Sequence, residues 1–190
     1  AGCLGTAAIG FVEKQYIDPG YVYNGVLAGL VSITSPCAVV SPFGAIVVGL
    51  IGSLVYVGAS KGVKAAGIDD AVDAFAVHGA CGAWGVIACG LFATPFYYSV
   101  SYYGDRKDDC AGLFYGGKAS GSFAAAFACV FVILAWVGST MGALFGTLKA
   151  TGLLRVSQEI EDAGLDDSKH GGAMSEVVAA SVDGVKATEA

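Results

Sequence analysis

His78 is the residue of this chain whose type and position most strongly indicate chemistry. It lies within residues 74–104, a run of 31 residues without Asp, Glu, Lys or Arg. A run of that length can cross a bilayer, and an ionisable side chain inside a membrane helix is costly, so such residues usually serve a function. A neutral imidazole has one donor and one acceptor nitrogen. His78 could therefore relay a proton or bind a small polar solute in a narrow pore; the alternative is a structural histidine bonded to a neighbouring carbonyl.

Three acidic residues, Asp69, Asp70 and Asp73, precede His78. Asp70 followed three residues later by Asp73 resembles a capping box, with both acids at the positive end of a helix dipole. Helix capping is the role we predict for Asp69 and Asp70. Asp73 lies five residues before His78, and it could instead attract or orient a cation on the cytoplasmic side.

Other patterns of catalytic or ligand-binding residues are missing from the sequence. His78 and Cys81 share a helical face at positions i and i+3, but two ligands do not make a metal site. No hydrolytic triad, phosphate loop or dinucleotide fingerprint is present. We therefore expect no enzymatic activity, no metal and no cofactor.

The elements that must position His78 are membrane helices. Of the 190 residues, 55% are hydrophobic and 14% are charged, whereas a soluble domain carries about 25% charged residues. Residues 19–60, 74–104 and 119–148 contain no Asp, Glu, Lys or Arg. Because about 20 apolar residues cross the hydrocarbon core, the first run can hold two spans and the others one each. The sequence predicts an all-α, multi-pass integral membrane protein.

The predicted organisation is a transmembrane region, residues 1–154, and a cytoplasmic regulatory tail, residues 155–190. Ser41-Pro42 is typical of a helix start, since an N-cap residue precedes proline at the first helical position. The first twelve residues are apolar but too short to cross a bilayer, so we expect a truncated helix and a fragment of a longer protein. The helical segments that we predict are a partial helix at 1–12 and spans at about 21–37, 42–58, 71–96 and 120–154.

Basic residues predict the orientation of these spans. One side of the membrane has five of them, against three on the other, and the richer side is cytoplasmic by the positive-inside rule. Residues 155–190 carry three basic and eight acidic side chains, which argues against nucleic acid or anionic lipid as a partner of the tail. The residues on the cytoplasmic side are Lys14, Lys61, Lys64, Lys149 and Arg155, and those on the other side are Arg106, Lys107 and Lys118.

Much of the glycine in this chain recurs at helical spacing. Small residues let helix backbones approach closely in lipid, so we expect these glycines to serve packing. The GxxxG patterns are Gly25/Gly29, Gly58/Gly62 and Gly138/Gly142/Gly146.

Three strings, found in this order, carry a family resemblance. The first is NGVLAGLVSIT at residues 24–34; the second is DD-x-x-D followed by VHG, at residues 69–79. The third is RVS at residues 155–157 with GLD at 164–166 and HG at 170–171. Together they resemble the eighth helix, the tenth helix and the cytoplasmic C-terminal segment of the ammonium transporter family (Amt/MEP, with the related Rh proteins).

The resemblance implies the second half of an eleven-helix ammonium transporter fold, closest to Amt/MEP members, with about five helices of which the first is truncated. It further implies a plasma-membrane homotrimer that takes a proton from NH4⁺ and conducts NH3 through a narrow apolar pore in each subunit. His78 matches the second of two histidines along that path. Ammonium or ammonia and the lipid bilayer are the expected partners, with a regulatory kinase or cytoplasmic protein acting at the tail.

Two alternatives stay open at this point. The chain could be a non-conducting half-transporter that regulates or pairs with full-length subunits, because the family's first histidine, aromatic gate and outer recruitment site have no match here. It could also be an Rh-like channel for NH3 or CO2, although the aspartates before His78 and the GLD…HG string favour Amt/MEP. The upstream coding sequence separates a fragment from a half-transporter. If it encodes about six further spans with a partner histidine, the chain is a fragment of a transporter. If an in-frame Met lies just before Ala1 after a stop codon, the chain is a half-transporter.

Ser168 provides a prediction about regulation. In plant members of the family the GLD…HG string holds a regulatory Thr whose phosphorylation shuts the trimer, and Ser168 stands at that position. We predict that a phosphate on Ser168 disrupts docking of the tail, because it adds negative charge to an already acidic segment. Ammonium uptake by cells expressing the full-length Ser168→Asp protein should fall, and undiminished uptake would contradict the prediction.

Overall fold

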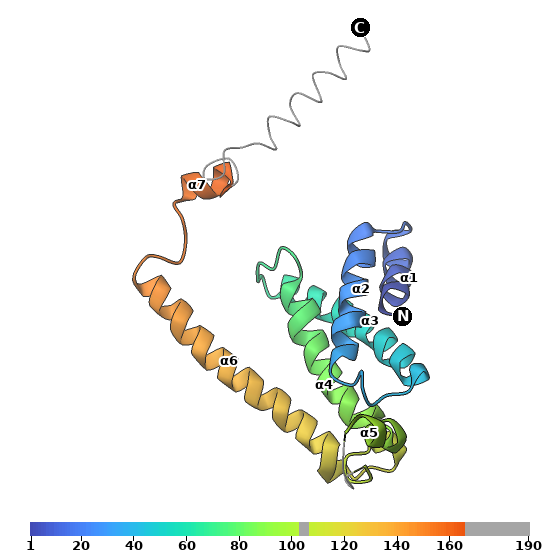
Figure 1. The fold of residues 1–190 in the computed structure, drawn as a ribbon. Helices are drawn as coiled ribbons and strands as arrows, with labels where there is room; N and C mark the ends of the chain where they lie inside the picture. Colours follow the sequence, from blue (N-terminus) through green and yellow to red (C-terminus); the bar gives the residue numbers. More distant parts are fainter. Residues whose placement is uncertain (103–106, 166–190) are drawn as a thin grey trace. The chain divides into compact units, whose positions relative to one another are not determined.

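The computed structural model of this protein consists of helices joined by loops (Figure 1). It describes residues 1–102 and 107–165, and in that part of the chain no strand occurs, so the predicted all-α class is confirmed. The chain divides into two units between Ala135 and Trp136, inside helix α6. The elements are α1 (Gly2–Lys14), α2 (Pro19–Thr34), α3 (Pro42–Ala65), η1 (Phe75–Ala80), α4 (Cys81–Phe92), α5 (Pro95–Ser101), η2 (Leu113–Tyr115), η3 (Ala119–Phe123), α6 (Ala124–Ala150) and α7 (Gln158–Ala163).

Three helical segments in the described residues are long and apolar enough to cross a membrane: Pro42–Ala65, Phe75–Phe92 and Gly121–Ala150. Pro42–Ala65 extends the predicted span at 42–58. The other two segments lie within the predicted spans at 71–96 and 120–154. The segment predicted at 21–37 is the shorter helix α2, and the partial helix expected at 1–12 is α1, which continues to Lys14. Large apolar side chains are exposed along the third segment, such as Phe131 at 71% and Trp136 at 70%, as expected of surfaces that face lipid or other helices.

Helices α2 and α3 begin with the same local signal. Asp18 precedes Pro19, and its side chain accepts a hydrogen bond from the Gly20 amide at 2.7 Å. Ser41 does the same before Pro42, accepting from the Gly44 amide at 3.1 Å. In both cases an N-cap residue is followed by proline at the first helical position, where a missing N–H costs nothing. Helix α2 therefore starts at Pro19, two residues earlier than predicted, because Asp18 caps it.

The predicted span 71–96 differs most from the observed segment. Its helix starts later, and its first turns, η1, are a π-helix. Its far end stops at Phe92, because Thr94 adopts an extended conformation (φ −95°, ψ 142°) before Pro95. A residue that precedes proline is forced away from helical geometry by the pyrrolidine ring. Pro95 then starts the separate short helix α5.

The first unit is a bundle in which α1, α2, α3 and the η1–α4 rod pack on one another (Figure 1). Its core is small, and it includes Ala28 of α2, Tyr56 of α3 and Val77 of η1. Two hydrogen bonds fasten α4 to α3: the Trp84 indole donates to the Val48 carbonyl at 3.0 Å, and the Cys81 thiol donates to the Gly52 carbonyl at 3.6 Å.

Some of the glycines permit close helix contacts, and others do not. A Cβ at Gly2 would lie 2.6 Å from the Gly25 carbonyl oxygen, and one at Gly85 would lie 2.7 Å from the Ser32 carbonyl oxygen. Only glycine fits where backbones approach so closely. Among the GxxxG glycines predicted to serve packing, Gly25 and Gly29 face the α1 backbone closely, since a Cβ there would lie 3.0 Å and 3.3 Å from Cα atoms of α1. The others have open space in the described residues, where a Cβ would have no neighbour within 4 Å: Gly58, Gly62, Gly138, Gly142 and Gly146.

We predict that Gly85→Ala lowers the stability of the bundle. The added methyl group must push α4 away from the α2 backbone, and overpacking of this kind costs about 1–3 kcal/mol. The thermal unfolding temperature of the detergent-solubilised protein should fall. Gly58→Ala is the matched control, because it adds the same group to a helix at a position with open space. Equal unfolding temperatures for the two variants would show that the α2–α4 contact is not tight.

Candidate functional site

His78 faces away from the core of its own unit. The π-helical turn η1 buries Ala76 (0% exposed) and Val77 (2% exposed) against the bundle, whereas His78 and Phe75 lie on the exposed side. Within the described residues no hydrogen bond to the imidazole occurs, so the structural histidine bonded to a nearby carbonyl, the alternative considered above, finds no support here. His78 is thus available to groups outside this bundle.

The π-helical turn itself shapes this exposed face. A π-turn adds one residue to a helical turn and is frequent at functional sites. In η1 the ring of Phe75 lies over Gly79, where a Cβ would be 2.8 Å from the ring. The absence of a side chain at Gly79, the residue after His78, therefore leaves room for the Phe75 ring against the helix.

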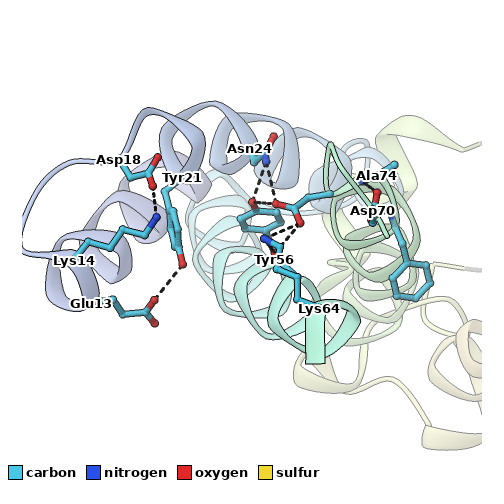
Figure 2. A network of polar contacts seen from close by, with 12 residues as sticks. Glu13, Lys14, Asp18, Tyr21, Asn24, Tyr56, Lys64, Asp70 and Ala74 are labelled. Atoms are coloured by element: carbon cyan, nitrogen blue, oxygen red, sulfur yellow. Dashed lines mark hydrogen bonds and ion pairs between the residues drawn. The ribbon is translucent and has the colours of Figure 1, made fainter. Parts of the chain in front are cut away.

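Asp73 accepts hydrogen bonds from two other helices, at the start of the segment that carries His78. Its carboxylate receives the Tyr56 hydroxyl at 2.8 Å and the Ser60 hydroxyl at 2.7 Å, both from α3. The Asn24 amide of α2 approaches at 3.4 Å, and the Lys64 ammonium lies at 3.4 Å. Figure 2 shows Asn24, Tyr56 and Lys64 within this polar network. We call Asn24, Tyr56, Ser60, Lys64 and Asp73 the Asp73 cluster.

Opposing effects act on the ionisation of Asp73, which precedes the candidate span that begins at Phe75. Partial burial raises the pKa of the carboxyl group, but the hydrogen bonds from Ser60 and Tyr56 and the charge of Lys64 lower it, and the net direction is downward. Donors that stabilise the charged form thus outweigh its desolvation. The carboxylate is therefore ionised at neutral pH.

Asp70 and Asp73 have different roles, contrary to the capping box that their spacing resembles. Asp70 caps the helix, since its two carboxylate oxygens accept the amides of Ala74 at 2.7 Å and Phe75 at 2.9 Å. Asp73 lies before the first helical turn rather than inside it, in a left-handed conformation (φ 55°). Its side chain consequently points to α2 and α3 instead of back along its own segment. Asp69 is exposed and makes no hydrogen bond or ion pair in the described part of the chain.

A polar pocket of about 350 Å³ surrounds the Asp73 cluster at the ends of α1, α2 and α3. Ion pairs join Lys14 to Asp18 and Lys61 to Glu13 at its rim, and the Tyr21 hydroxyl donates to Glu13 at 3.1 Å. The three lysines of α1 and α3, which were placed on one side of the membrane from sequence, all line this pocket. Most of its charges are therefore compensated.

Two further sequence predictions concern a metal site and Ser168. Among the residues that the structure describes, no group of three His, Cys, Asp or Glu side chains could hold a metal ion. Ser168 lies outside the described residues.

Sequence reasoning assigned no role to Asn24, Tyr56 or Ser60. One signal could have found two of them: Tyr56, Ser60 and Lys64 recur at intervals of four and so form a polar stripe along one face of the apolar helix α3. Such a stripe needs a polar partner, and Asp73 provides it. Nothing comparable marks Asn24, because its partner lies 49 positions away along the chain.

Comparison with known proteins now identifies the class. The model of the Ammonium Transporter Family matches residues 1–175, and this chain belongs to that family, as its motifs predicted. It is similar to Ammonium transporter 1 member 2 of Arabidopsis thaliana, with 46% identity over 177 residues, 90% of this chain and 33% of the relative. The chain thus spans about a third of the length of the curated relatives that it matches.

Solved structures show the same fold over part of their length. The chain resembles the structure titled Sensor Amt Protein with a TM-score of 0.73 and 28% identity, over 88% of this chain and 38% of that one. It resembles Mep2 of Candida albicans with a TM-score of 0.73 and 19% identity, over 83% of this chain and 34% of that one.

We predict that Asp70→Ala loosens the first turns of the segment that carries His78. Loss of a capping side chain costs about 1 kcal/mol, which corresponds to roughly fivefold more frequent opening. Hydrogen–deuterium exchange of the solubilised protein should accelerate at the amides of residues 74–77. Asp69→Ala is the matched control, and acceleration of the same size in both variants would exclude the capping role.

Proposed function

We propose that the protein containing this chain transports ammonium across a membrane, by removing a proton from NH4⁺ and conducting NH3 through a narrow apolar path in each subunit. The observation that carries the proposal is the position of His78. It is a polar, titratable side chain in an apolar span, it faces away from its own bundle, and it makes no hydrogen bond within the described residues. Family membership supports ammonium as the substrate.

Solvation explains why the proton must be removed. Transfer of an isolated ammonium ion into a low-dielectric medium costs tens of kcal/mol, whereas a neutral amine with hydrogen-bond partners costs a few. A neutral imidazole offers one donor and one acceptor nitrogen to the passing molecule. We infer that His78 lines the path and supplies this polar contact, while neighbouring apolar groups such as Phe75 exclude water and ions.

A closed path requires further helices over the exposed side of η1. Backbone and polar groups at membrane depth are tolerated only within protein or a lined cavity. We propose that the helices facing His78 belong to the remaining two thirds of a protein as long as its relatives. In the half-transporter alternative another polypeptide would provide them.

We further propose a homotrimer in the plasma membrane with a cytoplasmic tail. The gathering of Lys14, Lys61 and Lys64 around one pocket supports the orientation, because basic residues favour the cytoplasmic side. Two candidate spans, Phe75–Phe92 and Gly121–Ala150, follow this end in the sequence, and two crossings would return the chain to the same side for the tail. The tail begins at Arg155, just before α7, and this residue forms an ion pair with Glu161 of α7.

His78→Ala tests the proposal directly. In a yeast strain that lacks its own ammonium transport, the full-length protein should support growth on low ammonium, and the variant should lose at least about tenfold in uptake rate because a directed polar contact in the path is removed. Thr140→Ala is the control: it removes a polar side chain from a membrane span, but one whose hydroxyl bonds only to carbonyls of its own helix. Unchanged uptake by the His78 variant at equal surface abundance would refute the proposed role.

A further inference from the structure

We propose that Asp73 is a positioning residue for His78: its carboxylate fixes the place where the histidine-bearing segment begins and the side that this segment turns toward the path. This inference rests on the proposed function of His78. It differs from attraction of a cation, the role that the sequence suggested as an alternative for Asp73. Three features of the described residues support positioning.

First, most of the acceptor capacity of Asp73 is already used. An ionised carboxylate offers about four lone-pair sites. Tyr56, Ser60 and Asn24 donate to three of them, and the Lys64 ammonium forms an ion pair with the carboxylate at 3.4 Å. The Asp73 side chain is 14% exposed. A cation from solution would have to displace Lys64 or a buried hydroxyl before it could reach the carboxylate.

Second, the backbone of Asp73 connects this anchor to the histidine segment. Its carbonyl oxygen accepts a hydrogen bond at 2.9 Å from the amide of Val77, the residue before His78. Its left-handed φ of 55° turns the chain sharply into the first helical turn. Aspartate and asparagine adopt this conformation more readily than most residues with a side chain.

Third, one side chain contributes to both the anchor and the core. Tyr56, which is 3% exposed, donates to Asp73 and belongs to the same apolar cluster as Ala76 and Val77. Ala76 and Val77 face the core, so the residue that follows them is turned to the opposite side. The contact between Tyr56 and Asp73 therefore sets the rotation of η1, and with it the direction in which His78 points.

The contacts of Asp73 are unequal, and this inequality makes the proposal testable. The Lys64 side chain is 65% exposed, and an exposed ion pair contributes at most about 1 kcal/mol. The Tyr56 and Ser60 hydroxyls are buried and need an acceptor. Asparagine at position 73 would retain one of the two acceptor oxygens and tolerate the left-handed backbone, while it loses the charge and presents its NH2 group to the other hydroxyl, which can accept from it. Alanine would lose both the acceptor and the conformational preference.

The experiment measures ammonium uptake by the full-length protein as a function of concentration, normalised to surface abundance. Asp73→Ala should lower the maximal rate about tenfold to a hundredfold, with KM changed less than about threefold, because a small misplacement of a positioned group costs rate. Asp73→Asn should retain more than about half of the maximal rate, because one acceptor oxygen, a hydrogen-bonding amide and the left-handed backbone persist. Asp69→Asn and Asp69→Ala are the matched controls, and both should equal the unaltered protein.

Two results would overturn the inference. Equal losses in the Asn and Ala variants with a raised KM would show that the negative charge attracts the cation. Normal rates in both would show that Asp73 does not affect His78. If Asp73→Ala fails to reach the membrane, Tyr56→Phe serves instead, since it removes one donor and keeps the ring; an unchanged maximal rate in that variant would equally refute positioning.

A second measurement separates this inference from the proposed function. Hydrogen–deuterium exchange of solubilised protein needs no transport, and Asp73→Ala should accelerate exchange at residues 74–80 while leaving the amides of α1 unchanged. No uptake by the unaltered protein would refute the proposed function alone. Unchanged exchange at residues 74–80 in Asp73→Ala would refute positioning, whatever the protein transports.

Discussion

Close approach of helix backbones is the constraint on which the first unit depends. Lipid offers little hydrophobic drive for helices to associate, so association relies on van der Waals contact and a few hydrogen bonds. Glycines make that contact where α1 meets α2, at Gly2 and Gly25, and where α4 meets α2, at Gly85. The resulting core is made mostly of small residues such as Ala28, Ala76 and Cys81. A bundle packed in this way has little tolerance for added volume, and it holds η1 at a defined distance from α2 and α3.

Hydrogen bonds at one end of the bundle add direction to this packing. The Asp73 carboxylate gathers donors from α2 and α3, and Asp70 caps the helix that follows. The two aspartates are only three positions apart, yet one completes its own helix and the other joins neighbouring helices. The left-handed backbone at Asp73 explains this division, because it turns that side chain away from the helix axis. Packing therefore sets the separation of the helices, and the aspartates set where the histidine segment begins.

The sides of η1 differ in a way that suits a transport path. Ala76 and Val77 are buried, whereas Phe75 and His78 are exposed among the residues that the structure describes. A polar residue placed on an uncovered apolar surface is costly in a membrane, so a path between this surface and additional helices gives it a physical purpose. The family relationship agrees with this arrangement, since the chain matches about a third of the length of its relatives.

The sequence by itself determined the class of this protein and its apolar segments, and it marked His78 as a candidate site residue, because charge-free runs and short motifs are local properties of the chain. It also contained the Asp-Pro and Ser-Pro signals that start α2 and α3. Only the tertiary structure decided what Asp73 does and which glycines pack. Asn24 and Asp73 are 49 positions apart, and Gly85 meets the backbone of Ser32; such contacts depend on how helices are placed in space. A GxxxG pattern indicates that another helix can approach the glycines closely. Whether a helix lies there is decided by the fold.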